Sequence, residues 1–327
     1  MTKKSLHCLL TDTASARYMR PVIDTWQSRD TSFALNLHIS REAAPVLEDL
    51  SEKNPTRMLD RTDGTSIVDT SCDEGLLILS SAGGWPVEHA TKRHAQTLDI
   101  PVIQLIDTWY GYRVRLTENE DWLLPNILML VDEIAASEAQ SEGVPAEIVK
   151  IVGNPAWEQI EPEPASTTQK ILFLGAPVKH GYGDRLGYDE NSAWDLVLQA
   201  ASEQPELFSE LYYAPHPEQD EPDRLGPAKL TRYQPDRLDL YDTYIGMFSA
   251  PLIEAYLAGR RAISVQPNAT GLDMCPLSRH GRVRRVSSAN ELSLALGGSS
   301  MSSTQLRQSL RGSTQRVMET IDTALAA

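Results

Sequence analysis

Two polar residues in the second half of the chain form a pattern that could bind a phosphate. His216 ends the apolar run 210–217 between two prolines, so the strand must stop there and its imidazole is held on a stiff loop. Ser249 follows another apolar run and precedes Ala250 and Pro251, which suits the first turn of a helix. Because a helix N-terminus offers free N–H groups and partial positive charge, these residues predict a phosphate site.

Other residues near the same predicted strand ends would complete this donor site. Gly175 and Lys179 follow one strand, Pro217 follows another, and Glu254 lies one and a half turns into the helix, where it could accept hydrogen bonds from a ribose. Each feature also has a plainer explanation: a turn for the His-Pro pair, an ordinary cap for the serine, a solvated helix residue for Glu254. Together they favour a bound nucleotide phosphate.

Acidic residues in the first half could move a proton. Asp107 ends a predicted strand beside an aromatic loop, where we expect its carboxylate to act as a general base. Asp12 is the second candidate, with Arg17 positioning an anionic acceptor, while Trp109 and Tyr110 could stack on a sugar ring. Each has a plainer alternative. Asp107 could fix a loop turn, Asp12 could be a helix N-cap, and the aromatic residues could simply pack in the core.

The charge balance limits the partners. The chain carries 45 acidic and 30 basic residues, a net charge of −15, so its surface repels nucleic-acid phosphates and no nucleic-acid partner is expected. The basic segment 279–285 is a local exception that could be a phosphate patch, a membrane-surface patch or a solvated strand edge. No Asp-x-Asp pair occurs, so we expect no metal site and no cofactor other than the donor substrate.

Cysteine usage and hydropathy indicate the compartment. The three cysteines are scattered and odd in number, which is typical of a reduced, cytoplasmic protein. No stretch reaches the ~18 apolar residues of a membrane span, and the N-terminal apolar run is short. We therefore expect no integral membrane segment, with peripheral membrane contact left open.

Short apolar runs alternate with segments of helical period in both halves, which predicts βα units and parallel sheets. The predicted strands are 5–12, 33–39, 75–81, 101–107, 127–132 and 148–153 in the first half, and 170–177, 210–217, 243–248, 261–267 and 281–288 in the second. The predicted helices are 14–27, 41–53, 87–99, 191–202, 250–259 and a long terminal segment 304–325.

This pattern predicts an α/β fold of two Rossmann-like, doubly wound domains that face each other across a cleft. Residues 1–160 would form the first domain, 161–169 a Pro/Ser/Thr-rich linker, and 170–327 the second domain, which holds the candidate phosphate site. Whether the terminal helix crosses back to the first domain is left open. Ligands of such sheets bind outside the carboxyl ends of the strands.

Two longer strings resemble known enzymes. VDEIAASEAQSEGVPAEIVKIVGNPAWEQI (131–160) resembles the hinge region of GT-B glycosyltransferases and of non-hydrolysing sugar-nucleotide epimerases. YDTYIGMFSAPLIEAYLAGRRAISVQP (241–267) resembles the donor-domain segment of GT-B enzymes in which a Ser or Thr starts a helix. The His-Pro pair followed by that serine is similar to motifs of bacterial sialyltransferases and Kdo transferases.

The resemblance implies a metal-independent glycosyltransferase, with a CMP-activated nonulosonic acid or Kdo as a candidate donor and a glycan or small molecule as acceptor. It also implies that residues 1–160 form the acceptor-side domain and that residues 170–327 form the nucleotide-sugar-binding domain. His216, Ser249 and Ala250 would bind the donor phosphate and stabilise the leaving group. In sialyltransferase-like families the general base lies in an acidic motif, so the resemblance implies that Asp107 deprotonates the acceptor hydroxyl. Asp107 matches only the first acid of that motif, since Thr108 and Trp109 replace the rest.

Two alternatives remain. A sugar-nucleotide 2-epimerase shares the architecture, but those enzymes typically carry His-Arg-x-x-Asn and Asp-Ser-Gly-Gly, where this chain has HGYGDRLGYDEN and MFSAP. A non-catalytic sugar-nucleotide or glycan-binding protein is the second alternative, and turnover of a bound donor would separate it from an enzyme.

Overall fold

The computed structural model describes residues 4–29, 33–68, 75–80, 84–164, 169–216, 219, 222 and 224–326. Contacts between Cα atoms divide the chain into two compact units, residues 1–159 with 309–327 and residues 160–308. The terminal helix α13 (Ser313–Ala326) therefore belongs to the first unit, together with residues 309–312 directly before it, whereas residues 160–308 belong to the second unit. Among the described residues, no helix is long and apolar enough to span a membrane.

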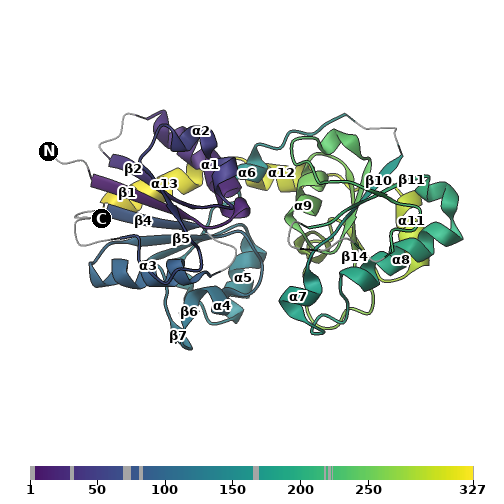
Figure 1. Cartoon of the computed structure of the whole chain (residues 1–327), viewed down its shortest axis with the longest axis horizontal. Helices are drawn as coiled ribbons and strands as arrows, with labels where there is room; N and C mark the ends of the chain where they lie inside the picture. The colour runs from purple at the N-terminus through teal and green to yellow at the C-terminus, as the bar shows by residue number, and fades with distance from the viewer. Residues whose placement is uncertain are drawn as a thin grey trace. The chain divides into compact units, whose positions relative to one another are not determined.

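The first unit is built on a seven-stranded parallel sheet in the order β3-β2-β1-β4-β5-β8-β9 (Figure 1). Its strands are β1 (Lys4–Leu10), β2 (Phe33–Ser40), β3 (Thr56–Leu59), β4 (Gly75–Ser80), β5 (Val102–Ile106), β8 (Ile127–Leu130) and β9 (Val149–Ile151). A separate antiparallel ribbon pairs β6 (Thr117–Glu118) with β7 (Asp121–Trp122). The direction of the strand order reverses beside β1, which is where ligands bind in doubly wound folds.

Helices cover the two faces of this sheet. They are α1 (Thr13–Gln27), α2 (Glu48–Ser51), α3 (Pro86–Thr97), α4 (Tyr112–Leu116), α5 (Glu133–Ser141), α6 (Pro155–Glu158) and α13. One apolar core joins α1 and α13 to alternate residues of β1 and β2, and a second core joins α3 to the opposite face. Buried residues recur along α1 at helical spacing, from Tyr18 and Met19 to Val22 and Trp26, which is why this segment forms a helix that packs on a sheet.

The second unit repeats the same plan with six parallel strands in the order β12-β11-β10-β13-β14-β15 (Figure 1). Its strands are β10 (Lys170–Leu174), β11 (Glu210–Ala214), β12 (Lys229–Leu230), β13 (Thr243–Gly246), β14 (Arg261–Val265) and β15 (Arg284–Val286). Its helices are α7 (Val178–Tyr182), α8 (Glu190–Glu203), α9 (Ala250–Leu257), α10 (Pro276–Arg279) and α11 (Ala289–Gly297), with α12 (Thr304–Leu310) at the boundary. The reversal of strand order lies here between β10 and β13.

Three sequence predictions need correction. The segment 41–53 forms only a 3₁₀ turn and the short α2, and the short strands β3 and β12 were not predicted. The terminal segment is two helices, because Gly312 takes a positive φ of 77° between α12 and α13. The carboxylate of Glu158 then accepts hydrogen bonds from the backbone N–H groups of Gly312 and Thr314, which ties the start of α13 to the first unit.

Candidate functional site

The carboxyl edge of the first sheet brings two predicted acids together. Asp12 follows β1 and Asp107 follows β5, with only β4 between these strands. Asp12 is the N-cap of α1. One oxygen of its carboxylate accepts a hydrogen bond from the backbone N–H of Ser15 at 2.7 Å, and the Ser15 hydroxyl oxygen accepts one from the backbone N–H of Asp12 at 3.1 Å. The capping role considered for Asp12 is therefore real, and it fixes the carboxylate beside the strand ends.

The environment of Asp107 suits proton transfer. The side chain is half-buried, and burial raises the pKa of its carboxyl to about 6, assisted by the negative charge of Asp12 and opposed by Arg115. Arg115 is itself held by the carbonyl oxygens of Tyr110 and Gly111, each at 2.8 Å. A carboxyl whose pKa lies near neutrality can both accept and donate a proton at physiological pH.

A polar network that the sequence did not indicate lies on the other face of the same sheet. Glu88 of α3 is buried, accepts a hydrogen bond from the Thr11 hydroxyl and accepts another from the backbone N–H of Trp85 at 3.1 Å. Lys92, one turn further, is fully buried, and its ammonium donates to Gln104 at 2.8 Å. Burial lowers the pKa of Lys92 to about 8. Glu88 and Lys92 stand four residues apart on a predicted helix, a spacing that could have drawn attention to them.

The aromatic residues predicted to stack on a sugar have mostly structural partners. Trp109 is only 6 % exposed, stacks on Trp157 with ring centroids 5.6 Å apart, and donates its indole N–H to Asp132 at 2.9 Å. The ring face used by Trp157 cannot also bind a sugar, so the packing alternative holds for Trp109. Tyr110 and Arg17 are both half-buried, on the loop after β5 and on α1 respectively.

The carboxyl edge of the second sheet carries the predicted phosphate site. Ser249 follows β13 and is the N-cap of α9, with Ala250 at the first helical position. Its hydroxyl makes no capping bond, and its Oγ is buried with no hydrogen-bond partner among the described residues. An unpaired buried hydroxyl costs about 1–3 kcal/mol, so a donor kept free at a helix start suits an anionic ligand.

His216 and Gly175 lie at the ends of the neighbouring strands β11 and β10. The backbone N–H of Gln219 donates to the His216 carbonyl at 2.9 Å, so the turn that was the plainer explanation for this histidine is present. Gly175 donates its N–H to Ala214 at 2.8 Å, and a Cβ at Gly175 would clash with the Gln219 side chain and lie 3.1 Å from the Tyr213 hydroxyl. A larger residue at this position would therefore require the Gln219 side chain to move. Pro217 lies outside the described residues.

The two remaining donor candidates behave differently. Glu254 is buried rather than solvated, and its carboxylate accepts a hydrogen bond from the Tyr233 hydroxyl at 2.5 Å. A ribose would therefore have to share that carboxylate with Tyr233. Lys179 is exposed on α7, 3.9 Å from Asp189, and its backbone N–H donates to Glu190 at 2.9 Å. An exposed ammonium of this kind can reach a ligand only by moving its flexible side chain.

Two further polar groups at this edge escaped the sequence analysis. Gln266 follows β14, and its amide nitrogen donates to Ser264 at 2.9 Å and to Asp273 at 2.7 Å. Because a carboxylate can only accept, this contact fixes the amide orientation and leaves the Gln266 oxygen buried without a partner. The buried Tyr188 hydroxyl, close to Asp273, also has no hydrogen-bond partner among the described residues. A polar residue directly after the apolar run 261–265 was the available signal.

The described residues contain no group of three or more His, Cys, Asp or Glu side chains that could hold a metal ion. Their two cysteines, Cys8 and Cys275, are buried free thiols.

Comparisons with known proteins identify the fold. No family model and no curated protein match the sequence. The chain is similar to the UDP-GlcNAc 2-epimerase of Neisseria meningitidis bound to UDP-GlcNAc, with a TM-score of 0.67, 13 % identity and coverage of 98 % of this chain and 100 % of that one. The chain is also similar to the Methanocaldococcus jannaschii UDP-GlcNAc 2-epimerase in complex with UDP-GlcNAc and UDP. The TM-score is 0.64 and the identity 13 %, with coverage of 98 % of this chain and 99 % of that one.

MurG of Acinetobacter baumannii, a GT-B glycosyltransferase, is similar with a TM-score of 0.57 and 13 % identity, over 98 % of this chain and 99 % of MurG. At such identities the likeness concerns the fold, and it extends over both units. The predicted α/β fold of two Rossmann-like units is confirmed, and this chain has a GT-B-like fold.

Proposed function

We propose that this chain is a sugar-nucleotide enzyme and that it inverts the configuration at C2 of an N-acetylated nucleotide sugar. The observation that carries the proposal is the whole-chain similarity to UDP-GlcNAc 2-epimerases, two of them solved with UDP-GlcNAc. The 2-epimerase, an alternative in the sequence analysis, thus becomes the leading hypothesis, ahead of transfer from a CMP-activated sugar.

The nucleotide half-site belongs to the second unit. The start of α9 offers the Ser249 hydroxyl, the Ala250 amide and the positive end of the helix dipole to a phosphate group. His216 would add a second donor from the end of β11, next to the strand from which Gly175 emerges. The departing or retained diphosphate carries charge that such preorganised donors stabilise.

The acid–base half-site belongs to the first unit. Inversion at a carbon atom requires that a C–H bond breaks on one face and forms on the other, so groups able to give and take a proton are needed. Asp107, with a pKa near 6, is suited to this exchange, and Asp12 is a second carboxylate at the same sheet edge. We therefore assign Asp107 to proton exchange at C2 of the sugar, in place of the deprotonation of an acceptor hydroxyl that the sequence analysis expected.

Glycosyl transfer is the second candidate function. It is favoured by the likeness to MurG and by the absence of the two motifs that 2-epimerases typically carry, since HGYGDRLGYDEN and MFSAP occupy their positions. The same nucleotide half-site would serve a transferase, with Asp107 acting on an acceptor hydroxyl. A protein that binds the sugar nucleotide without converting it would use the same nucleotide half-site, and it would need no group that transfers a proton.

The test is incubation with UDP-GlcNAc in D2O, followed by NMR and mass spectrometry. A 2-epimerase yields the C2 epimer with one deuteron bound at C2, and Asp107→Asn abolishes that incorporation while UDP binding persists. Release of UDP that depends on an added acceptor would instead identify a transferase. Binding of UDP-GlcNAc without either product would identify a binding protein. If neither UDP, CMP nor UDP-GlcNAc binds, the proposal is wrong.

A further inference from the structure

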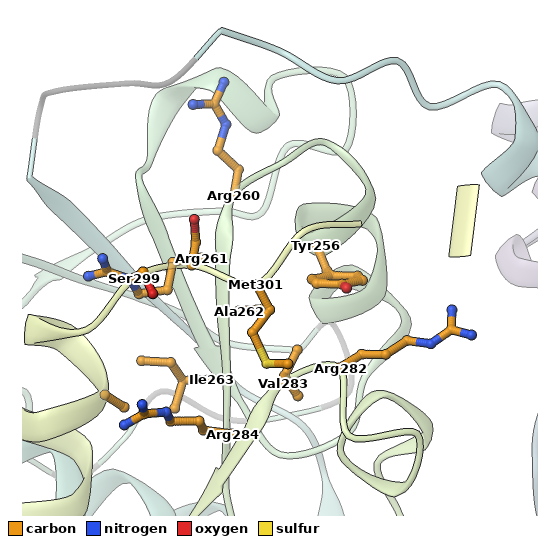
Figure 2. A pocket seen from close by; sticks show the side chains of 12 residues that line it. Tyr256, Arg260, Arg261, Ala262, Ile263, Arg282, Val283, Arg284, Ser299 and Met301 are labelled. Carbon is orange, nitrogen blue, oxygen red and sulfur yellow. The ribbon is translucent and has the colours of Figure 1, made fainter. Parts of the chain in front are cut away.

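Two buried charged side chains lie on one helix of the first unit. Among the described residues, the buried Asp, Glu, Lys and Arg side chains are Glu88, Lys92, Glu254 and Arg260. A buried charge is costly unless a partner compensates it. Arg260 pairs with Glu163 of the linker at 2.5 Å, and Figure 2 shows its guanidinium extending away from the hollow that the other labelled side chains line. Glu88 and Lys92 both belong to α3, and their partners lie at the sheet of the first unit.

Helix α3 lies over the strands between the two candidate acids. It packs on β4 and β5, and β4 lies between β1 and β5 in the sheet (Figure 1). Asp12 follows β1, and Asp107 follows β5. A helix in this position can therefore bond to both strands that carry the carboxylates.

Glu88 connects the start of α3 to the end of β1. One oxygen of its carboxylate accepts a hydrogen bond from the Thr11 hydroxyl, and the other accepts one from the backbone N–H of Trp85 at 3.1 Å. Thr11 is fully buried and directly precedes Asp12, and its carbonyl oxygen accepts from the Ser40 hydroxyl at 2.9 Å. The residue before Asp12 is therefore fixed by α3 through its side chain and by β2 through its backbone.

Lys92 connects the next turn of α3 to β5. Its ammonium donates to the side-chain oxygen of Gln104 at 2.8 Å, and both side chains are buried. Gln104 stands on β5, three residues before Asp107. Burial lowers the pKa of Lys92 to about 8, and the charges of Glu88 and Glu118 oppose that effect. Lys92 is therefore mostly protonated at neutral pH and holds β5 by a charge-assisted hydrogen bond.

The separation of Asp12 and Asp107 determines how strongly each carboxylate affects the ionisation of the other. Burial raises the pKa of Asp107 to about 6, with the negative charge of Asp12 acting in the same direction and Arg115 in the opposite one. Tyr18 of α1 also lies within electrostatic reach of Asp107, and its hydroxyl donates to the Gly153 carbonyl at 2.5 Å. Because the repulsion between two carboxylates falls with distance, a movement of either strand end would change the proton affinity of Asp107.

Packing alone does not require these polar side chains. Replacing a buried polar or ionic pair by apolar side chains of similar volume is often neutral or stabilising, so apolar residues could hold α3 on the sheet equally well. Polar partners add a fixed direction and distance.

We propose that Glu88 and Lys92 are positioning residues, which fix the strand ends that carry Asp12 and Asp107 and so set the separation of the two carboxylates. The contacts that carry this inference are the hydrogen bonds to the Thr11 hydroxyl and to the Gln104 side chain. The inference rests on the proposed proton transfer at Asp107, because that reaction is what the positioning serves.

The experiment measures the pKa of Asp107 in the full chain by NMR of its carboxyl carbon, whose signal is identified by its absence in Asp107→Asn. Two variants each remove one contact of α3. Thr11→Val removes the hydroxyl that donates to Glu88 and changes no charge. Lys92→Met/Gln104→Leu removes both partners of the second contact, so neither is left buried without the other.

The control Thr91→Val removes a buried hydroxyl from the same helix. That hydroxyl accepts a hydrogen bond from the backbone N–H of Ile67 at 3.2 Å, so its partner lies in a loop rather than on a strand that carries a carboxylate. The control should lose stability, as Thr11→Val does, and keep the wild-type pKa of Asp107.

We expect the pKa of Asp107 to fall by about half a pH unit or more in both test variants, since two carboxylates that repel each other separate when a contact that holds them is lost. The direction is decisive for Lys92→Met/Gln104→Leu, because the loss of a nearby positive charge by itself would raise the pKa of a carboxyl. The free energy of unfolding of this double variant should stay close to that of the wild type.

Three results would overturn the proposal. They are a wild-type pKa of Asp107 in Thr11→Val, an unchanged or raised pKa in Lys92→Met/Gln104→Leu, and a fall of equal size in Thr91→Val, which would indicate a general loosening of the helix. If Thr11→Val does not fold, the double variant decides the question alone.

Turnover separates this inference from the proposed function. If the wild type incorporates deuterium at C2 of UDP-GlcNAc, both test variants should do so at least about tenfold more slowly with unchanged affinity for UDP, because a misplaced proton-transfer group slows the chemical step. Wild-type rates in both variants would overturn the positioning role and leave the proposed function intact. A wild type without turnover, but with the expected changes in the pKa of Asp107, would refute the proposed function and leave the positioning of the carboxylates intact.

Discussion

Replacing Asp107 with Asn should stabilise the protein while it removes the proposed activity. Burial and the nearby charge of Asp12 raise the pKa of Asp107 from its ordinary value of 3.8 to about 6, so the ionised form is disfavoured in the folded state. At ~1.36 kcal/mol per pH unit, the ionised carboxylate destabilises the folded state at pH 7 by up to ~3 kcal/mol. An amide at this position carries no charge and avoids that penalty.

The sign of the pH dependence makes the prediction specific. Between pH 6 and 4 the folded state holds a proton that the unfolded state releases, so the penalty disappears as the pH falls. The gain from Asp107→Asn should therefore be largest at pH 7 and above, about half as large near pH 5, and close to zero below pH 4.

The assay is urea unfolding of the wild type, of Asp107→Asn and of Asp121→Asn at several pH values, with the transition of the first unit identified as the one that shifts. Asp121 is exposed on β7 of the same unit, so its variant controls for the loss of one surface charge. A stability gain that is absent, or that does not change between pH 4 and 7, would refute the account of Asp107 as a carboxyl with a raised pKa.

Three further predictions concern single side chains. Ser249→Ala should weaken UDP binding about tenfold and raise the midpoint of thermal unfolding, because it removes a buried hydroxyl that has no hydrogen-bond partner in the described structure. Glu158→Gln should destabilise the first unit by ~1–3 kcal/mol and increase amide exchange in the first turn of α13, which this carboxylate caps. Burial and His7 lower the pKa of His38 to about 3, so stability should fall as the pH drops below 6.5, and His38→Met should reduce that loss in acid unfolding curves.

The residue pattern was sufficient to predict that strands and helices alternate, because apolar runs and helical periodicity indicate which faces are buried. It was also sufficient for placing Asp107, His216 and Ser249 in the segments that follow the carboxyl ends of β5, β11 and β13, which is where they lie. The lengths of individual helices were predicted less well. The terminal segment looked like one helix because the local pattern does not show that Gly312 adopts a positive φ or that Glu158 caps a new helix there.

What the sequence could not decide is which polar residues are buried. Glu254 and Lys92 look like solvated helix residues by composition, yet the fold places one beside Tyr233 and the other beside Gln104. Trp109 looked available for a sugar until Trp157, 48 positions later in the chain, was seen to cover its ring.

The sequence by itself determined the α/β architecture, the strand ends and the candidate phosphate-binding helix, because these depend on local periodicity and turn chemistry. Only the tertiary structure decided the raised pKa of Asp107 and the unpaired hydroxyl of Ser249. The physical reason is that pKa values and hydrogen-bond satisfaction depend on neighbours that are distant in the chain, and those neighbours are brought together only when the sheets form.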